Sequence, residues 1–413
     1  MTVRSAFVRC AFASGVIVAA LAVCMQRGEA HKAITSKYTY NDDVFPILRE
    51  RCSPCHISGG VAPMSLMTYE EAFPWAESIR AELVAAHMPP WNAEDGFGDL
   101  KRAHTLPSKD LDIILTWATG GNPRGALDQK LPDVKLRNEW TLGAPDLALQ
   151  LPSEFTLGAD KMEDTHEVTL ATGTSEARWV RAVDLLPGTP SIVRSATIFV
   201  KEPTAPSTNS PTPERVLAHW LPGHELEPID SGTAFRLPAG AQLGVRIHYK
   251  KTWQFEGKAL TDRSAIGVYF APVKEARELM MLPIEGTAVP PAGAPSQTVS
   301  FGRSLGEDVQ AVALSPDVVP SNITLQVEAV RPDGVRTPML RLNTRADWDR
   351  RYWFTRPLAL TRGTKIEVTA NFEDPDILSS AFAVAPPTTP KPRPETLRLT
   401  LDVLPANARP AAP

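Results

Sequence analysis

The chain has 413 residues, which is too long for one small domain and typical of roughly two or three. Hydrophobic residues make up 43% and charged residues 22%, ordinary values for a protein with a buried core. The formal net charge of −4 gives no reason to expect nucleic acid or an anionic membrane surface as a partner. The 39 prolines indicate many turns, and helix-favouring runs become scarce after about residue 125.

The first 30 residues have the pattern of an export signal. Arg4 and Arg9 supply a basic start, residues 11–23 form an apolar run too short to span a bilayer, and Gly28-Glu29-Ala30 offers a small-x-small cleavage site. Lipoprotein processing at Cys24 is the alternative, although the valine before it is a poor match to the small residue expected there. We therefore expect residues 1–30 to be a signal peptide and the protein to be periplasmic.

Three helices are expected between residues 31 and 125. Asn41 can cap the first helix, which runs toward Cys52. Thr68 and Glu71 have the spacing of a capping box for the second, in which Pro74 marks the first turn or a kink. Ser108 can cap the third, which two consecutive glycines end.

The stretch Cys52-Ser53-Pro54-Cys55-His56 has the spacing used for covalent attachment of c-type haem. Each thiol would add across one haem vinyl group, and His56 would bind the iron from the proximal side. A zinc site would need two more ligands at ordered spacing, and a thioredoxin-like dithiol would need a βαβ context; the flanking sequence supplies neither. The other two cysteines, Cys10 and Cys24, fall in the signal segment, so we expect one haem and no disulfide.

The sixth iron ligand is expected to be a methionine. Met88 is the first candidate, because it follows a predicted helix and two prolines would stiffen its loop. Met64 and Met67 are alternatives, whereas His87 or His104 would give a bis-histidine iron of lower potential. An open distal site, as in a haem peroxidase, would require all three methionines to leave the iron free.

Short β-type runs follow a predicted linker at residues 126–140 and are separated by clusters of Pro, Gly, Asn and Asp. They are residues 167–170, 179–186, 191–201, 242–249, 265–270, 323–330 and 365–372. That spacing is typical of antiparallel β-sandwiches. We expect a multidomain chain: a small all-α domain at 31–125, jelly-roll-like β-sandwiches at 141–280 and 281–405, and a mobile tail at 406–413.

Five short motifs occur in a fixed order along the first predicted sandwich. They are Trp179–Val183, Pro187-Gly188, Trp220–Gly223, Leu237–Gly240 and Val245–Tyr249. In this order they resemble the bacterial relatives of the copper type II, ascorbate-dependent monooxygenases, the group of peptidylglycine α-hydroxylating monooxygenase. Some of those relatives carry an N-terminal c-type cytochrome domain, and the stretch from residues 61–64 through residues 88–91 is similar to it. The resemblance covers nearly the whole mature chain and implies a cytochrome c domain at 31–125.

In that family each β-sandwich holds one copper ion, and most of the ligands are histidines. The adjacent histidine pair of the first site falls on Arg194 and Ser195 here, and the His-x-His pattern of the second falls on Asp317 and Val319. No methionine stands where the family has its late ligand, and His248 alone matches a ligand position. Because one imidazole is too few for such a site, we expect no bound copper and keep His248 as a weak candidate.

These observations predict an exported c-type cytochrome that transfers single electrons through a covalent haem. The degenerate monooxygenase-like module would serve for docking or scaffolding, with a redox protein or a larger electron-transfer complex as partner. The alternative is a copper-dependent, haem-fed monooxygenase that hydroxylates a small organic substrate. Neither prediction includes nucleic acid or a stable membrane span.

Overall fold

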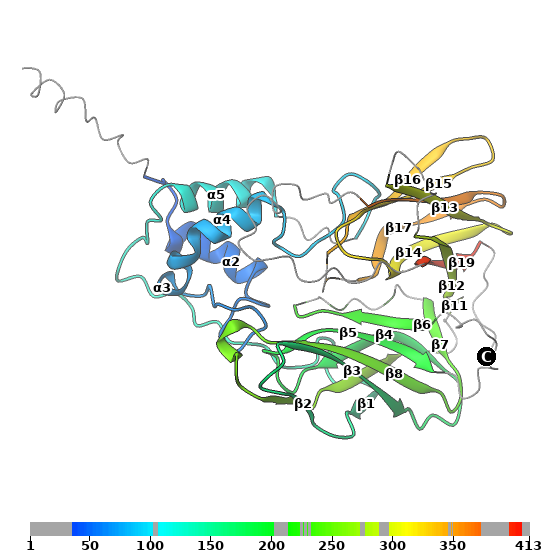
Figure 1. Ribbon diagram of the computed structural model, residues 1–413, viewed down its shortest axis with the longest axis horizontal. Helices are drawn as coiled ribbons and strands as arrows, with labels where there is room; N and C mark the ends of the chain where they lie inside the picture. The colour runs from blue at the N-terminus through cyan, green and yellow to red at the C-terminus, as the bar shows by residue number, and fades with distance from the viewer. Residues whose placement is uncertain are drawn as a thin grey trace, which may run out of the picture.

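The computed structural model describes residues 35–101, 106–201, 214–223, 226, 229, 233–272, 277–288, 297–345, 348, 350–372 and 396–406. The predicted signal peptide, His104 and the predicted tail beyond Ala406 lie outside this range. Within it the chain is mostly β-strand, and a smaller helical part lies beside one end of the stacked sheets (Figure 1). Every helix among these residues is too short or too polar to cross a membrane.

The helical part contains short helices packed around one apolar cluster. Its elements are η1 (Tyr40–Val44), α2 (Phe45–Arg51), α3 (Tyr69–Ala72), η2 (Phe73–Trp75), α4 (Ala76–Val84) and α5 (Ser108–Thr119). Tyr40 and Trp117 are fully buried in this cluster, where their rings lie 6.0 Å apart. Burying large aromatic rings provides much of the apolar area that holds such short helices together.

The predicted caps of the second helix are confirmed. Thr68 and Glu71 form a reciprocal capping box at α3, and Pro74 lies in η2, the short 3₁₀ segment that separates α3 from α4. A proline there removes a backbone donor, so the helix is interrupted as expected.

The other two caps differ from the prediction. Thr39, and not Asn41, caps the first helix: its hydroxyl accepts the backbone N–H of Asp42, while the buried Asn41 amide donates to the Ala126 carbonyl. Ser108 is the first residue of α5 rather than its cap, and the cap position before it makes no side-chain hydrogen bond. Asn41 therefore connects this helix to the segment at Ala126, far along the chain, and a local sequence pattern does not reveal such a contact.

Residues 126–140, the predicted linker, contain neither helix nor strand. The first β-sandwich follows and pairs two sheets. One has the order β1 (Leu147–Gln150), β10 (Ala265–Phe270), β4 (Arg178–Leu186), β7 (Thr233–Leu237) and β11 (Arg277–Glu278). The other has the order β3 (Glu163–Ala171), β8 (Gln242–Lys250), β5 (Val193–Lys201) and β6 (Arg215–Trp220), and a small pair joins β2 (Phe155–Leu157) to β9 (Leu260–Asp262).

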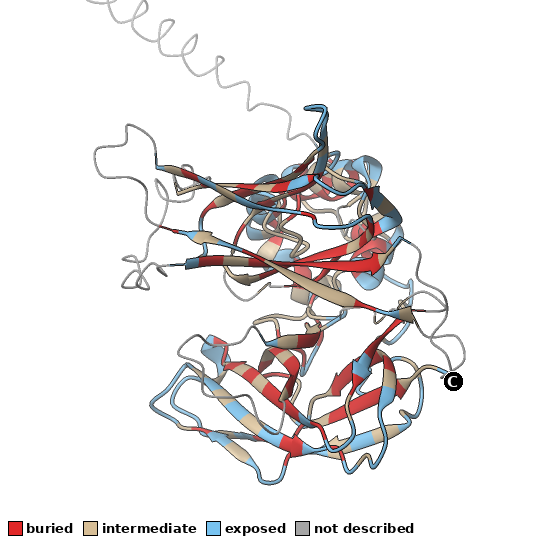
Figure 2. Ribbon diagram, turned by 90° about the vertical axis from the view of Figure 1, so that its right-hand side faces the viewer, coloured by how far each residue is buried: buried red, intermediate tan, exposed pale blue. Residues whose placement is uncertain are grey.

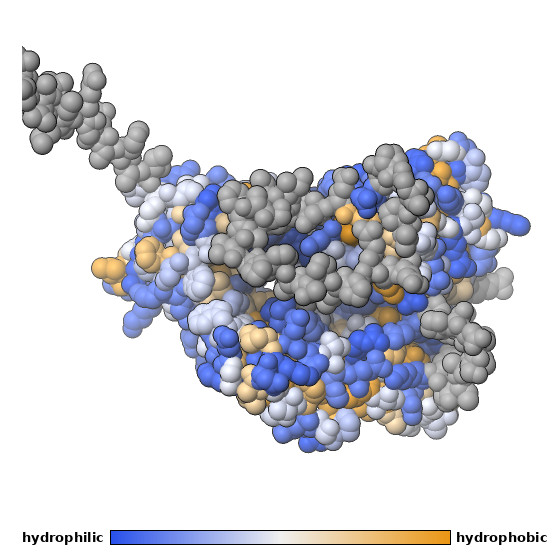
Figure 3. Space-filling model, viewed as in Figure 1, coloured by the Kyte–Doolittle hydropathy of each residue, from blue (hydrophilic) through white to orange (hydrophobic). Residues whose placement is uncertain are grey.

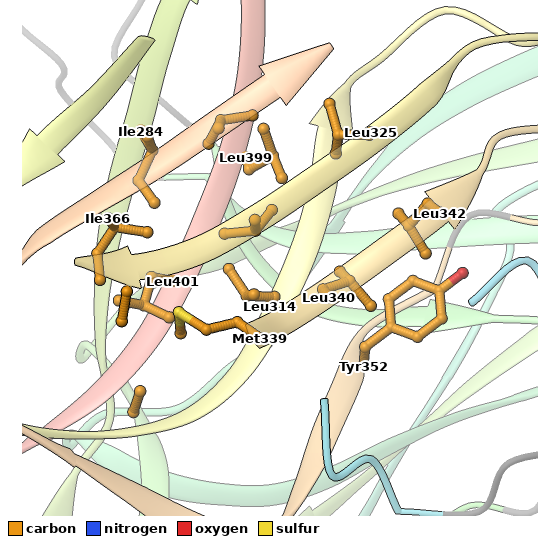
Figure 4. Close-up of a cluster of buried hydrophobic side chains, with 14 of the residues drawn as sticks. Ile284, Leu314, Leu325, Met339, Leu340, Leu342, Tyr352, Ile366, Leu399 and Leu401 are labelled. Carbon is orange, nitrogen blue, oxygen red and sulfur yellow. The ribbon is translucent and has the colours of Figure 1, made fainter. Parts of the chain in front are cut away.

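The second β-sandwich also pairs two four-stranded sheets. They have the orders β12 (Met280–Thr287), β19 (Thr396–Pro405), β14 (Val309–Val318), β17 (Tyr352–Leu360), and β13 (Thr298–Ser304), β18 (Lys365–Asn371), β15 (Thr324–Val330), β16 (Arg336–Asn343). Leu314, Leu325 and Leu399 come from three of these strands and gather in one interior cluster (Figure 4). The prediction of antiparallel β-sandwiches is confirmed, with one parallel pair, β7 and β11.

Alternating burial explains why these runs are strands. In β8, Val245, Ile247 and Tyr249 are buried, while Arg246 and His248 between them lie on the outer face. Side chains on successive residues of a strand point to opposite faces, so one face joins the core and the other meets solvent. Buried and more exposed residues alternate along the strands in Figure 2, and the described surface in Figure 3 is mainly hydrophilic.

The segment at residues 91–101, which follows α4, leaves the helical part and packs on the second sandwich. Ala93 and Leu100 form isolated β-bridges to Leu342 and Phe354, and Ala93 belongs to the buried core of that sandwich. These contacts connect the loop after α4 directly to β16 and β17. The sequence pattern contains no sign of them.

The two sandwiches are joined by a buried arginine. Both terminal nitrogens of Arg351 donate to first-sandwich carbonyls, those of Leu217 and Val216, and its Nε lies 2.7 Å from the Asp402 carboxylate of the second. Leu404, next to this pair in β19, is part of the first sandwich's apolar cluster. The described sandwiches therefore share one packed interface.

Candidate functional site

The Cys-x-x-Cys-His motif forms one hydrogen-bonded turn at the end of α2. The N–H of Cys52 donates to the Leu48 carbonyl, which continues the helix by one residue. The N–H groups of Cys55 and His56 both donate to the Cys52 carbonyl, at 3.2 and 2.8 Å. The N–H of Leu66 then donates to the His56 carbonyl, so the following loop folds back over the turn. The two thiols and the imidazole are thus all carried by one turn, which several backbone hydrogen bonds hold in place.

The His56 ring is held in an orientation suited to metal binding. Its Nδ1 lies 3.3 Å from the backbone carbonyl of Met64, so a proton on Nδ1 can be donated there while Nε2 keeps its lone pair. Burial lowers the pKa of His56, the Met64 carbonyl partly opposes this, and the positive charge of Arg194 lowers it further. A neutral imidazole is the form that coordinates iron.

Cys52 and Cys55 are half-buried and are not joined by a disulfide. Burial raises the pKa of Cys52 to about 12, and the neighbouring Cys55 adds to the rise. Burial also raises the pKa of Cys55 to about 11, against the opposing charges of Arg194 and Arg350. Redox-active Cys-x-x-Cys pairs depend on a lowered thiol pKa. The environment here therefore disfavours a thioredoxin-like dithiol.

The three candidate methionines differ in their surroundings. Met67 is buried within the helical core, while Met64 and Met88 are partly buried against it. The Met64 carbonyl lies 3.3 Å from Nδ1 of the His56 imidazole, which places its backbone beside that ring. His87, the neighbouring alternative to Met88, has its Nδ1 2.9 Å from the Glu82 carboxylate on α4.

The first sandwich covers the cysteine motif. The Cys55 sulfur lies 3.6 Å from the carbonyl oxygen of Pro222, in the turn after β6. The next residue, Gly223, has a φ of +68° and packs on Pro54, where an added Cβ would lie 2.2 Å from the Pro54 Cβ. The turn therefore approaches the motif as closely as a residue without a side chain permits.

We expect Gly223→Ala to lower the stability of the protein by more than Gly240→Ala. Gly240 has the same φ of +68° but nothing within 4 Å of its position, so it reports the backbone strain alone, about 1–2 kcal/mol. The additional loss in Gly223→Ala measures its contact with Pro54. Urea unfolding of both variants checks this, and equal losses would contradict the close contact.

The candidate copper residues of the first sandwich lie side by side. Ser195 in β5 pairs with His248 in β8, and Arg194 occupies the irregularity in register next to them. The Nε2 of His248 lies 3.7 Å from the Glu163 carboxylate on the outer face of the sheet. Asp317 of the second sandwich accepts a hydrogen bond from Thr400. Among the described residues, no three His, Cys, Asp or Glu side chains are grouped as they would need to be to hold a metal ion.

Two arginines near the motif were not among the predicted site residues. Arg194 was considered only as a substitution of a copper ligand, yet its charge acts on both Cys55 and His56. Arg350, from the second sandwich, also acts on Cys55 and donates to the carbonyl of Pro90 in the Met88 loop. An adjacent arginine pair at the start of an aromatic strand was the only available signal in the sequence.

A scan against protein-family models finds no family that matches the chain, and a search of curated proteins finds no match either. A functional assignment therefore depends on the motif and on the geometry around it.

Proposed function

We propose that the protein is an exported c-type cytochrome that transfers single electrons between redox partners. Cys52 and Cys55 would hold the haem by thioether bonds, and His56 would be the proximal ligand. When bound, the haem supplies one-electron chemistry at its iron. The observation that carries the proposal is the His56 ring, which contacts the Met64 carbonyl through Nδ1 and shares one turn with two unpaired thiols.

The residues around the motif support a bound haem. In the chain without haem the thiols are protonated at neutral pH, since burial raises the pKa of each, and the imidazole is neutral, since burial lowers its pKa. The Pro222 turn and the helical core cover the motif from two sides, which limits access of water. Burial of this kind is one of the means by which a protein sets a haem potential.

Met88 is the distal ligand that this arrangement favours. The backbone carbonyl of Met64 contacts Nδ1 of His56, so the Met64 backbone lies on the side of the ring opposite Nε2, the nitrogen that would face the iron. Met67 is buried in the helical core. The Met88 loop is held at one end by its N–H to the Glu82 carbonyl and at the other by Arg350, which donates to the Pro90 carbonyl. A loop held at both ends can present a thioether in a constant position.

We expect Met88→Ala to remove the methionine-to-iron charge-transfer band of the oxidised protein and to lower the reduction potential, because thioether ligation raises that potential. Met64→Ala is the matched control, since it removes a side chain but leaves the backbone carbonyl that orients His56. Absorption spectra and redox titration of the two holoproteins check this. A band that survives in Met88→Ala and disappears in Met64→Ala would reverse the assignment.

In this proposal the β-sandwiches dock or scaffold the cytochrome part. The alternative, a haem-fed copper monooxygenase, has one observation in its favour, the neighbouring positions of Ser195 and His248. Against it, Arg194 brings a fixed positive charge to the same place, and a protonated guanidinium cannot coordinate a metal.

Elemental analysis after copper loading and dialysis tests the two functions together. We expect about one iron per chain, copper well below one, and no ascorbate-dependent hydroxylation of peptidylglycine-type substrates. The iron should undergo a reversible one-electron reduction. Stoichiometric copper that is lost in His248→Ala would support the monooxygenase, while absence of iron from the exported protein would exclude the cytochrome.

A further inference from the structure

Arg350 is a buried cation that pairs with no carboxylate among the described residues. Its residue is only 6% exposed, its Nη2 donates to the Pro90 carbonyl at 2.7 Å, and its guanidinium lies over the Trp91 ring, 5.3 Å from the centroid. Among the described residues it has no ion pair with a carboxylate, and its buried Nε has no hydrogen-bond partner. The adjacent Arg351, equally buried, has the Asp402 carboxylate. A buried charge normally requires such a partner.

The position of Arg350 indicates where that partner would lie. It lines a cavity of about 70 Å³ where the first sandwich, the second sandwich and the segment at residues 91–101 meet, together with Trp91, Trp220 and Trp353. Its nearest titratable neighbours include Cys55, whose thiol pKa it helps to lower against the larger effect of burial. Arg350 therefore lines the cavity and is close enough to the cysteine motif for its charge to act on Cys55.

We propose that Arg350 is the anchor of a carboxylate-binding site at this junction, and that the carboxylate is a propionate of the haem attached to Cys52 and Cys55. The identification of the carboxylate as a haem propionate rests on the proposed function.

A guanidinium offers five N–H donors in a planar fork. Among the described residues only one donor of Arg350 has a hydrogen-bond partner, so Nε and a terminal nitrogen can bind a carboxylate in a bidentate pair. The Trp91 face keeps the guanidinium plane in place. A free organic carboxylate that enters the cavity has the same chemistry.

The site would make a residue of the second sandwich part of the haem environment. A cation beside a buried propionate offsets its negative charge, and that charge otherwise stabilises oxidised, more positive iron. Loss of the cation should therefore lower the reduction potential. The same arginine donates to the Met88 loop, so one side chain would join the distal loop to the haem edge.

The test uses the full-length holoprotein with Arg350→Gln, Arg350→Lys and the control Arg356→Gln. Arg356 lies in β17, the strand that begins shortly after Arg350, its side chain is 86% exposed, and its ion pair with Asp99 is a long one, 3.8 Å. We expect Arg350→Gln to lower the reduction equilibrium constant at least about tenfold, or about 59 mV for one electron. We also expect it to shift the propionate bending band in resonance Raman spectra. Arg350→Lys keeps the charge, so it should shift the band with a smaller change in potential. Arg356→Gln should do neither.

The Raman band separates this site from a merely structural arginine, because loss of the Pro90 contact alone would leave the propionate vibration unchanged. If Arg350→Gln does not fold, Arg350→Lys carries the same measurement. An unchanged potential and band in both variants would overturn the propionate assignment.

Benzoate is the probe for a free carboxylate. If it raises the thermal midpoint of the wild type and of Arg356→Gln but not of the Arg350 variants, and the Raman band is unchanged, the site binds a free carboxylate instead of a propionate. If the wild type carries no haem, the proposed function fails, and the benzoate measurement still tests Arg350 on the haem-free chain. If the Arg350 variants change neither the reduction potential nor the Raman band, and benzoate does not raise the thermal midpoint of the wild type, Arg350 does not form a carboxylate-binding site.

Discussion

If the protein is the cytochrome proposed above, replacing Cys52 and Cys55 together with alanine is expected to reduce covalently bound haem from one per chain to none. Thioether bonds to these two sulfurs are the only covalent attachment that the motif provides, so no haem should remain after denaturation. Each single variant retains one sulfur and should keep a reduced amount. Mass spectrometry of the denatured chain, produced with export and the haem-attachment machinery, measures the result directly.

Ser53→Ala is the matched control within the same turn, because the Ser53 hydroxyl donates to the Arg49 carbonyl of α2 and neither of these groups belongs to the proposed attachment chemistry. It should retain full haem. The apolar clusters of both sandwiches contain neither cysteine, so the β signal in circular dichroism should persist in the double variant. Haem retained in the double variant, or absent from the wild type, would refute covalent attachment at this motif.

Arg351→Met is expected to destabilise the protein by about 3–5 kcal/mol at neutral pH, because it leaves the Asp402 carboxylate buried without its partner. Asp402 is fully buried, and Arg351 also donates to two carbonyls of β6 that would lose these bonds. Arg356→Met removes an exposed arginine from β17, the strand that begins just after Arg351, and should cost little. Urea unfolding of both variants compares the two losses.

The loss in Arg351→Met should increase with pH. Burial raises the pKa of Asp402 from 3.8 to about 6, the charge of Arg351 opposes this, and Asp317 adds to the rise. The folded state thus binds the Asp402 proton more tightly than the unfolded state does. The stability that this proton contributes is therefore present below the unfolded pKa and is lost as pH rises through the folded value.

Without Arg351 the folded pKa of Asp402 should rise further, so the variant should be closest to wild type near about pH 5 and furthest from it near about pH 8. The double variant Arg351→Met with Asp402→Leu should recover most of the stability and lose this pH dependence, since a buried pair can be replaced by apolar residues of similar size at little cost. A loss independent of pH would show that the carbonyl contacts of Arg351 matter more than its charge.

The sequence by itself determined the features that are formed by residues close together along the chain. Five consecutive residues, Cys52 to His56, contain the whole of the proposed haem-attachment motif, and they lie on one hydrogen-bonded turn. Short β-type runs between clusters of turn-forming residues, such as 242–249, predicted the strands, and the alternating burial of Val245, Arg246 and Ile247 in β8 agrees with strand geometry. The capping box of Thr68 and Glu71 was also predictable, since its bonds span three residues.

Only the tertiary structure decided what surrounds that motif. Pro222 meets Cys55 across 167 positions of sequence, and Arg350 meets Pro90 across 260. Arg350 and Arg351 are adjacent and identical in type, yet one has the Asp402 carboxylate as its partner and the other has a backbone carbonyl and a tryptophan face. Composition and periodicity cannot distinguish them, because the difference arises from which distant strands pack together and from which buried charges then lie within reach.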